Sequence, residues 1–280
     1  NPYNTQNLNK NKNYIFFKLD LNNKNKITKI LRKYKPEGIF NLAAETHVDR
    51  SIDKPKNFIH SNILGTYNLL QSILAHKKKI KLVHVSTDEV YGDIIKGRSD
   101  EKSSYNPSSP YSASKASADH LINAYIRTYK IPAVISNCCN NYGPNQNREK
   151  LIPKLIYSLK NNKNLEIYSD GKNQREWIYV NDHCAALIKI MKRGIIGNQY
   201  NIGSREIFTN LFIAKRVMKI YKKIYNSKCK SKITFVKDRL GHDFRYALNS
   251  NKIRRKLKWK PIYNFEKGLM KTLDHYLKIN

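Results

Sequence analysis

Short apolar runs alternate along the first half of the chain with longer segments in which apolar residues recur at helical intervals. The runs have the length of buried parallel strands and lie at residues 14–19, 38–43, 80–85 and 133–136. The amphipathic segments predict helices at residues 22–35, at residues 56–76 and from Tyr111 onward. This alternation predicts an α/β fold with a doubly wound parallel sheet and crossover helices.

The pattern becomes less regular after Gly143, where strand-like and helix-like segments follow one another in no fixed order. The clearest of them lie at residues 165–168, 179–192, 199–202 and 233–236. We expect two units. Residues 1–145 would form the sheet domain, with some later segments returning to it, and residues 146–280 mainly a smaller mixed α/β lobe that binds the substrate.

Length and composition narrow the class of protein. A chain of 280 residues can bury a large core, and this one contains no apolar run long enough to cross a membrane. Its first residues are polar and lack the apolar core of a secretory signal. The four cysteines match no zinc-binding spacing, so we expect reduced, buried thiols, no metal site and a cytoplasmic enzyme.

A formal net charge of +32 is typical of proteins that bind nucleic acid. However, the lysines are scattered through every segment, and no nucleic-acid-binding motif accompanies them. We therefore expect no specific nucleic-acid partner, and a positive field that favours an anionic substrate. A basic interaction protein is the alternative from another class. Salt-sensitive binding to nucleic acid that survives mutation of Tyr111 would identify it.

Two adjacent carboxylates follow the apolar run at residues 80–85. Thr87, Asp88 and Glu89 would leave the carboxyl end of that strand, which is where open parallel sheets hold their reactive groups. Two carboxyl groups in different environments can supply one proton donor and one proton acceptor. In isolation, an Asp-Glu pair after a strand is more often a solvated turn.

A second candidate lies at the start of the helix that follows. Tyr111 and Lys115 are four residues apart, so their side chains leave the same helical face. An ammonium near a phenol favours the phenolate and is expected to lower the pKa of Tyr111. A tyrosine in that state is a general base for a sugar hydroxyl. By itself, a Tyr-x-x-x-Lys pair is a weak signal, because it occurs by chance in many helices.

Seven motifs occur in order along the chain. They are Asn-Leu-Ala-Ala-Glu-Thr-His-Val-Asp-Arg-Ser at 41–51, Ser-Thr-Asp-Glu-Val-Tyr-Gly at 86–92, Ser-Pro-Tyr-Ser-Ala-Ser-Lys at 109–115, Asn-Cys-Cys-Asn-Asn-Tyr-Gly-Pro at 137–144, Arg-Glu-Trp-Ile-Tyr-Val-Asn-Asp-His at 175–183, Tyr-Asn-Ile-Gly at 200–203 and Asp-Arg-Leu-Gly-His-Asp at 238–243. Together they resemble the extended short-chain dehydrogenase/reductase family, and within it the enzymes that dehydrate nucleotide sugars at C4 and C6. The resemblance implies a Rossmann-like sheet, NAD as cofactor, a homodimer and a part in making deoxysugars for polysaccharides.

The resemblance also implies a role for each residue of the two candidate segments. Tyr111 removes the proton of the 4-hydroxyl while hydride passes from C4 to NAD, and Lys115 positions the nicotinamide ribose. Glu89 is the base at C5, Asp88 the acid for the departing C6 hydroxyl, and Thr87 a hydrogen-bond partner of the sugar. Hydride returns to C6, so that dTDP-glucose becomes the 4-keto-6-deoxy sugar nucleotide plus water. Related 4-epimerases usually have small hydroxyl residues at the acid pair, and a 4-epimerase or decarboxylase of the same fold is the alternative.

The same resemblance assigns further residues to the cofactor and to the substrate. Those expected at the cofactor, besides Tyr111 and Lys115, are Asp20, Leu21, Leu42, Ala43, Ala44, Glu45, Thr46, Ser61 and Asn141. Those expected at the nucleotide sugar, besides Thr46 and Thr87, are Asn140, Lys150, Leu151, Glu166, Ile167, Tyr168, Arg175, Asn210, Asp238 and His242. Arg175 suits a diphosphate on chemical grounds as well, because a guanidinium fork matches phosphate oxygens. His47 and Asp49 receive no role.

One part of the family pattern does not occur in the 280 residues. There is no Gly-x-x-Gly-x-x-Gly loop, and no acidic residue where one is expected at the adenosine ribose. We expect that the first strand, the phosphate-binding turn, the first helix and the second strand of such a fold precede Asn1 in a longer protein. If the natural chain began at Asn1, the pyrophosphate would lose its helix N-terminus, and an inactive truncated remnant is therefore a further alternative.

Overall fold

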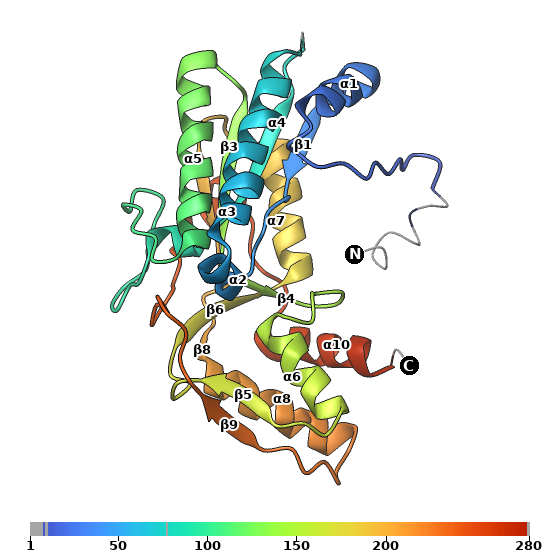
Figure 1. Ribbon diagram of the computed structural model, residues 1–280, viewed down its shortest axis with the longest axis vertical. Helices are drawn as coiled ribbons and strands as arrows, with labels where there is room; N and C mark the ends of the chain where they lie inside the picture. Colours follow the sequence, from blue (N-terminus) through green and yellow to red (C-terminus); the bar gives the residue numbers. More distant parts are fainter. Residues whose placement is uncertain (1–7, 9–10, 77, 279–280) are drawn as a thin grey trace.

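The computed structural model describes residue 8, residues 11–76 and residues 78–278. Its main sheet has four parallel strands in the order β1-β2-β3-β7 (Figure 1). They are β1 (Gly38–Asn41), β2 (Lys81–Thr87), β3 (Ala133–Cys138) and β7 (Gln199–Ile202). The parallel α/β fold predicted from the periodicity is confirmed. The segment at residues 199–202, which the sequence grouped with the second lobe, forms β7 and pairs with β3.

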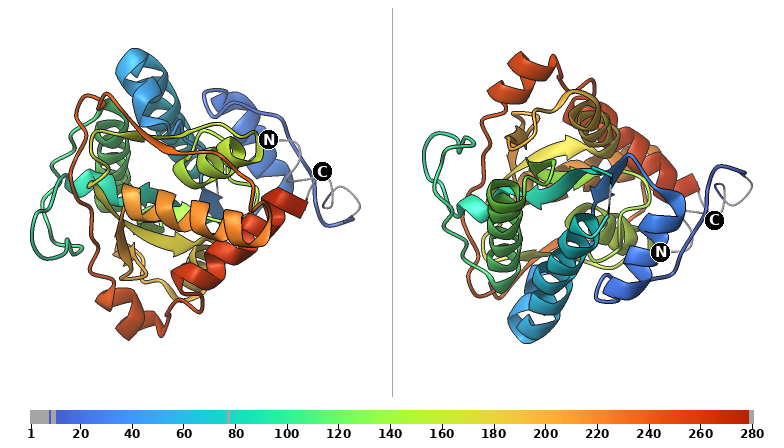
Figure 2. Two further views of the ribbon diagram at one scale, coloured as in Figure 1. Left: turned by 90° about the horizontal axis from the view of Figure 1, so that it is seen from below. Right: turned by 90° about the horizontal axis from the view of Figure 1, so that it is seen from above.

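Helices cover both faces of this sheet, as Figure 2 shows from two directions. Neighbouring residues of β2 point to opposite faces, so Leu82 and Val83 belong to different core clusters. Leu82 packs against α1, α4 and α5, while Val83 packs against α7. These helices are α1 (Lys24–Tyr34), α4 (Gly65–Leu74), α5 (Pro110–Tyr129) and α7 (Val180–Arg193). Burial on both faces explains why the strands read as continuous apolar runs.

The helix predicted at residues 56–76 forms as three consecutive pieces. They are α3 (Pro55–Phe58), a π-helical segment (Ile59–Leu64) and α4. A π-helical turn adds a residue to the helix and rotates the side chains that follow it. Asn62, in the middle of this segment, is directed inward and buried.

The strand predicted at residues 14–19 is wrong. These residues are irregular, and within the described chain they pair with no neighbouring strand. The side chains of Ile15 and Phe16 are exposed, and Phe17 rests against Tyr34 of α1 with 5.5 Å between ring centroids. An apolar run becomes a strand only where another strand accepts its backbone hydrogen bonds, which periodicity alone cannot reveal.

The second lobe combines two small sheets with helices and lies below the main sheet in Figure 1. Its strands are β4 (Asn140–Tyr142), β6 (Gln174–Tyr179) and β8 (Ile207–Thr209) in one sheet, and β5 (Leu165–Tyr168) and β9 (Ile233–Val236) in the other. Its helices include α6 (Leu151–Lys160), α8 (Asn210–Ile224) and α10 (Phe265–Lys278). Two short helices complete the chain, α2 (Val48–Asp53) before α3 and α9 (Asn251–Leu257) after β9.

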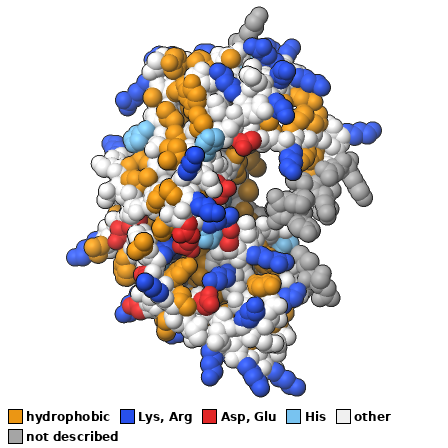
Figure 3. All heavy atoms as spheres, viewed as in Figure 1, with side chains coloured by type: hydrophobic (Ala, Val, Ile, Leu, Met, Phe, Trp, Pro, Cys, Tyr) orange, Lys and Arg blue, Asp and Glu red, His pale blue; other side chains and the backbone are white. Residues whose placement is uncertain are grey.

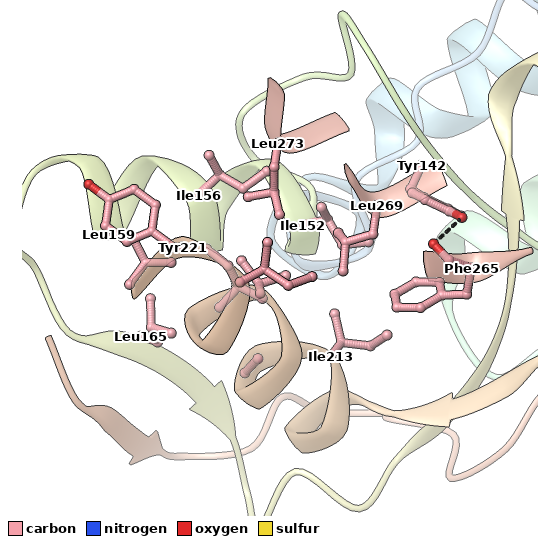
Figure 4. Close-up of a cluster of buried hydrophobic side chains, with 14 of the residues drawn as sticks. Tyr142, Ile152, Ile156, Leu159, Leu165, Ile213, Tyr221, Phe265, Leu269 and Leu273 are labelled. Atoms are coloured by element: carbon pink, nitrogen blue, oxygen red, sulfur yellow. Dashed lines mark hydrogen bonds between the residues drawn. The ribbon is translucent and has the colours of Figure 1, made fainter. Parts of the chain in front are cut away.

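The second lobe has a core of its own, in which α6, α8 and α10 meet β5 and β6 (Figure 4). Each fully buried side chain there contributes about 1.5–3 kcal/mol of hydrophobic free energy. The phenol of Tyr142 is also buried and donates to the carbonyl of Phe265 at 3.0 Å, which ties β4 to the start of α10. A separate core gives this lobe a defined surface to face the main sheet.

The surface agrees with the scattered charge of the sequence. Lys and Arg side chains are spread over the visible face and do not gather into one patch (Figure 3). Among the described residues, no helix has both the length and the apolar character that crossing a membrane requires. All four cysteines are free, but Cys184 is exposed, so the prediction that every thiol is buried is wrong at that position.

Candidate active site

The two carboxylates lie on a tight turn at the carboxyl end of β2. The strand ends at Thr87, and a 3-10 turn (Asp88–Tyr91) follows directly. The hydroxyl of Thr87 accepts from the Glu89 backbone N–H at 3.3 Å and donates to Asp88 Oδ1 at 3.2 Å. These bonds fix the turn, which buries Asp88 and leaves Glu89 half-buried.

Tyr111 and Lys115 lie in the first turns of α5, which packs against β2. Ser109 caps this helix, and its hydroxyl and that of Ser112 each accept from the other's backbone N–H in a capping box. The cap fixes where the helix begins and therefore which face meets the strand. Both Tyr111 and Lys115 are buried on that face, as the four-residue spacing predicts.

The two acids have different electrostatic surroundings. Burial raises the pKa of Asp88 well above its ordinary value, and the charge of Glu89 adds to the effect. Burial also raises the pKa of Glu89, but the guanidinium groups of Arg239 and Arg175 act against it. Asp88 is therefore the group that keeps its proton, and Glu89 the one that ionises more readily. Two neighbouring carboxyl groups with different tendencies to ionise can supply one proton donor and one proton acceptor.

The expectation that Lys115 lowers the pKa of Tyr111 is wrong for the structure described. Burial raises the pKa of Tyr111 well above its ordinary value, and the charge of Glu89 acts in the same direction. The ammonium of Lys115 instead donates to the carbonyl of Val85 at 2.7 Å. Nevertheless, the charges of both Glu89 and Asp88 act on Tyr111, which places the phenol and the two acids in one site.

A cavity of about 480 Å³ opens beside Glu89, between the main sheet and the second lobe. Ten residues predicted for the nucleotide sugar line it: Thr46, Asn140, Lys150, Leu151, Glu166, Ile167, Tyr168, Arg175, Asn210 and His242. Asp238 contacts it indirectly, through a 2.6 Å bond to His242. Thr87, Asp88 and Tyr111 are buried and do not line its wall. Residues from both lobes therefore meet at one cavity, and Glu89 is part of its lining.

Four polar contacts join the lobes around this cavity. Lys150 Nζ donates to the carbonyl of Thr46 at 2.6 Å, and Arg50 forms a 2.6 Å ion pair with Glu149. The phenol of Tyr168 donates to Asp49 at 3.1 Å. Asp49 also lies 3.7 Å from Arg239, measured from Oδ1 to Nη1.

Several residues that line the cavity were given no role from the sequence, among them His47, Asp49, Glu149 and Trp177. Arg239 also lines it and lies in the turn at residues 238–242 that the family resemblance assigns to the nucleotide pocket. His47, Asp49 and Trp177 lie inside the motifs at 41–51 and 175–183. Their position in those motifs was the signal that could have found them. Glu149 lies outside every motif, and only the approach of the two lobes reveals it.

Arg175 lines the cavity, and its side chain is largely buried. Its guanidinium donates to the carbonyls of Asp243 at 2.9 Å and Phe244 at 3.2 Å, and it covers the ring of Tyr246 at 4.4 Å. Because backbone carbonyls hold the fork in place, its charge has a fixed position beside Glu89. That is a favourable arrangement for an anionic ligand.

Several of the residues predicted for a cofactor lie in the loop that follows β1. Leu42, Ala43 and Ala44 follow β1 in a loop that is largely exposed. The side chain of Asn62 accepts from the Glu45 N–H at 2.8 Å and donates to the Glu45 carbonyl at 3.0 Å, which fixes this loop. Asn62 was missed from the sequence, because the π-helical turn that directs it inward has no signature in the periodicity.

The remaining cofactor candidates lie in other segments of the chain. Asp20 borders a shallow hollow at the start of α1, and Leu21 packs close to Gly65 of α4. Ser61 lies in the π-helical segment. Asn141 is in β4, and its buried Oδ1 has no hydrogen-bond partner among the described residues.

This geometry defines a class of protein. A doubly wound parallel sheet, with a Tyr-x-x-x-Lys helix packed against the strand that carries the acids, is the arrangement of the short-chain dehydrogenases/reductases. The chain belongs, more narrowly, to the GDP-mannose 4,6 dehydratase family, whose model matches residues 1–272. The resemblance found in the sequence is thereby confirmed.

Curated relatives and solved structures are similar over almost the whole chain. A dTDP-glucose 4,6-dehydratase from Neisseria gonorrhoeae is 43% identical over 284 residues, covering 95% of this chain and 82% of that protein. The structure of the Streptomyces venezuelae dTDP-glucose 4,6-dehydratase, solved with NAD bound, has a TM-score of 0.94 and 37% identity, and the match covers 100% of this chain and 84% of that one. A UDP-glucuronic acid 4-epimerase from Bacillus cereus, also solved with NAD, has a TM-score of 0.90 at 28% identity, over 99% and 86% of the two chains.

Proposed function

We propose that this protein is a hydro-lyase that dehydrates dTDP-glucose, with NAD, to the 4-keto-6-deoxy sugar nucleotide and water. The observation that carries the proposal is the adjacent acid pair at the end of β2. Asp88 is buried and keeps its proton, while cationic neighbours favour the ionised form of Glu89. An elimination needs both a proton acceptor at C5 and a proton donor for the leaving hydroxyl. A 4-epimerase needs neither group.

Each residue then has one task. Tyr111 accepts the proton of the sugar 4-hydroxyl, Glu89 removes the proton at C5, and Asp88 protonates the departing C6 hydroxyl. Thr87 hydrogen-bonds the sugar and keeps the turn in shape through its bonds to Glu89 and Asp88. Arg175, with Lys150 and His242, holds the diphosphate end in the cavity. The enclosed site keeps the Asp88 proton from exchanging freely with water.

The residues present fit the nicotinamide end of NAD. The buried Asn141 Oδ1 lacks a partner among the described residues and suits an amide donor, and Ala43 and Ala44 leave room for a close approach to the backbone. Lys115, Ser61 and Thr46 supply hydroxyl and ammonium groups. When bound, NAD supplies the acceptor and donor of hydride and a positive charge that favours a Tyr111 phenolate. The sequence contains no Gly-x-x-Gly-x-x-Gly loop for the pyrophosphate.

We further infer a division of labour and a partner. Residues 1–145, joined by β7, hold the cofactor, and residues 146–280 mainly hold the nucleotide. A second copy of the chain covers the outer face of the π-helical segment, α4 and α5, where the exposed apolar residues are Ile59, Leu64, Tyr67, Leu74 and Tyr129. Supply of deoxysugars in the cytoplasm is the role that this reaction serves. Light scattering on the purified protein tests the dimer.

Incubation with dTDP-glucose and NAD tests the reaction, with the products separated and identified by mass spectrometry. We expect a product lighter than the substrate by one water. A product of unchanged mass with inverted configuration at C4 would instead identify an epimerase. The absence of any product, together with the absence of NAD binding by calorimetry, would contradict the proposal for this chain.

Two variants assign the acids within that assay. In Glu89→Gln, exchange of the C5 hydrogen with deuterated solvent falls sharply. In Asp88→Asn, loss of water slows by about two to four orders of magnitude, the range of general acid catalysis, while the first oxidation is less affected. Equal losses in both steps for both variants would remove the separate assignments.

A further inference from the structure

A second polar cluster, largely buried, packs against the face of α5 that carries Tyr111 and Lys115, and it has no part in the mechanism above. It consists of His84, Ser86, Tyr105 and Asp119, and we call it the Asp119 cluster. Asp119 is 0% exposed and His84 is 1% exposed. Charged and titratable groups are rarely enclosed so fully unless something pairs with them.

The helix relates this cluster to the candidate site. Tyr111, Lys115 and Asp119 are spaced by four residues, so all three side chains leave α5 toward β2. Lys115 lies between the phenol and the carboxylate, one helical turn from each. The charge of Asp119 is therefore closer along the helix to Lys115 than to Tyr111.

Asp119 accepts two hydrogen bonds at one carboxylate oxygen, and the other oxygen lies near a histidine ring. Its Oδ2 accepts from the Ser86 hydroxyl at 2.6 Å and from the Tyr105 phenol at 2.9 Å. Its Oδ1 lies 3.5 Å from Nε2 of His84. Asn41 Nδ2 is 3.1 Å from the other ring nitrogen of His84, so polar neighbours contact the ring on both sides.

The charges within the cluster can be counted. Burial lowers the pKa of His84 well below its ordinary value, so the ring is neutral. Burial raises the pKa of Asp119 to about 6, against the charge of Lys115 and the donors, so the carboxylate is ionised at neutral pH. Desolvation raises the pKa of the half-buried Cys138 thiol to about 12, so this group is neutral as well. The cluster therefore encloses one negative charge, one helical turn along α5 from the ammonium of Lys115.

The ammonium depends on that negative charge. Burial lowers the pKa of Lys115, and Asp119 is the largest influence that raises it, followed by Cys138. Lys115 Nζ is also 3.5 Å from His84 Nε2 and donates to the Val85 carbonyl. A buried ammonium without a counter-ion loses its proton, because transfer from water to a medium of low dielectric is costly.

We propose that Asp119 is a positioning residue, whose enclosed carboxylate is the counter-ion that keeps the Lys115 amine protonated and fixed against β2. Its effect on turnover rests on the proposed function of Lys115, but its effect on the charge of Lys115 does not. The two can therefore be tested separately. The charge is measured without substrate or cofactor.

The first experiment measures the titration of Lys115 in the full chain. Lysines are labelled with ¹³C at Cε, and the Lys115 resonance is the one absent from Lys115→Met. In Asp119→Asn, which keeps the shape of the side chain, the midpoint falls by about one pH unit or more. Asp182→Asn is the matched control: it neutralises another buried carboxylate, which accepts from the Ile262 and Tyr263 N–H groups, and it leaves the Lys115 midpoint unchanged. An unchanged midpoint in Asp119→Asn overturns the proposal.

Thermal unfolding provides a second test, which remains informative if one of the variants folds poorly. If the two groups pair, Lys115→Met added to Asp119→Asn raises the melting temperature above that of Asp119→Asn alone, because no uncompensated charge remains. The pairing is overturned if adding Lys115→Met lowers the melting temperature of Asp119→Asn by as much as it lowers that of the wild type. If Asp119→Asn does not fold but the double variant does, the pairing is supported.

Turnover then connects the charge to catalysis. In Asp119→Asn, kcat falls about tenfold or more while KM for dTDP-glucose stays the same, and the basic limb of the pH profile moves to lower pH. Wild-type protein that makes no product contradicts the proposed function and leaves the titration result standing. A shifted Lys115 midpoint with unchanged kcat and an unchanged pH profile overturns the positioning role alone.

Discussion

Gly92 closes the turn that holds both acids, and replacing it by alanine is the sharpest test of that turn. Its φ of 73° lies in the left-handed region, and its N–H donates to the carbonyl of Glu89. A Cβ at this position would lie 2.1 Å from the carbonyl oxygen of Asn106. The clash is with backbone, so no side-chain rotation can relieve it.

The expected loss follows from that distance. Cβ atoms essentially never approach another heavy atom closer than 3.0 Å, so the turn and the Asn106 segment must separate by about 0.9 Å. Asp88 and Glu89 lie in the same turn and shift with it. A misplacement of about 1 Å costs about 100-fold in rate. The left-handed backbone costs a further ~1–3 kcal/mol of stability.

Gly97 provides a matched control in the same loop. Its φ of 79° is equally unfavourable for alanine, but a Cβ there meets nothing within 4 Å. Gly97→Ala should therefore lose stability and keep its kcat within a few-fold, whereas Gly92→Ala loses both. Product formation by mass spectrometry and melting temperature are measured for both. Wild-type kcat in Gly92→Ala would refute the argument that the Asn106 contact sets the position of the acids.

Two further predictions concern pH. In Arg239→Gln, the acidic limb of the pH profile of kcat/KM moves to higher pH. The reason is that Arg239 is the strongest of the charges that lower the pKa of Glu89 against the effect of burial. An acidic limb at the wild-type position would show that ionisation of Glu89 does not produce that limb. Burial lowers the pKa of His183 from 6.5 to about 4, so on acidification the unfolded chain binds a proton at this ring before the folded protein does. The free energy of unfolding therefore falls between pH 6.5 and pH 4, by up to about 3 kcal/mol, and is unaffected by this group above pH 6.5. His183→Leu should flatten the curve of unfolding free energy against pH in that window, and an unchanged slope would show that this ring is protonated in the folded protein.

Some features of the candidate site follow from residues close together in the sequence, and others depend on segments that are far apart. The turn at Thr87 and the helix at Tyr111 could be read directly, because each is encoded within a few residues by a strand end and by a Ser-Pro cap. The state of Tyr111 could not. The spacing to Lys115 suggested a lowered pKa, but burial by distant segments decides it and raises it.

The part of the site between the lobes was visible only through motifs that the family shares. Thr46 and Lys150 are far apart in sequence, and no periodicity indicates that one donates to the other's carbonyl. The same holds for Asp49, which received no role although it contacts both Tyr168 and Arg239. Contacts of this kind depend on how two separately packed cores meet.

The sequence by itself determined the elements whose cause is local: parallel strands from continuous apolar runs, helices from their period and caps, and the acid pair at the end of β2. Tertiary structure alone decided that residues 199–202 join the main sheet, that residues 14–19 form no strand, and that Asn62 turns inward to hold the loop after β1. It also decided which buried groups carry charge. The physical reason is that strand pairing and desolvation depend on neighbours distant in the chain, whereas capping and amphipathic period depend on residues within a turn or two.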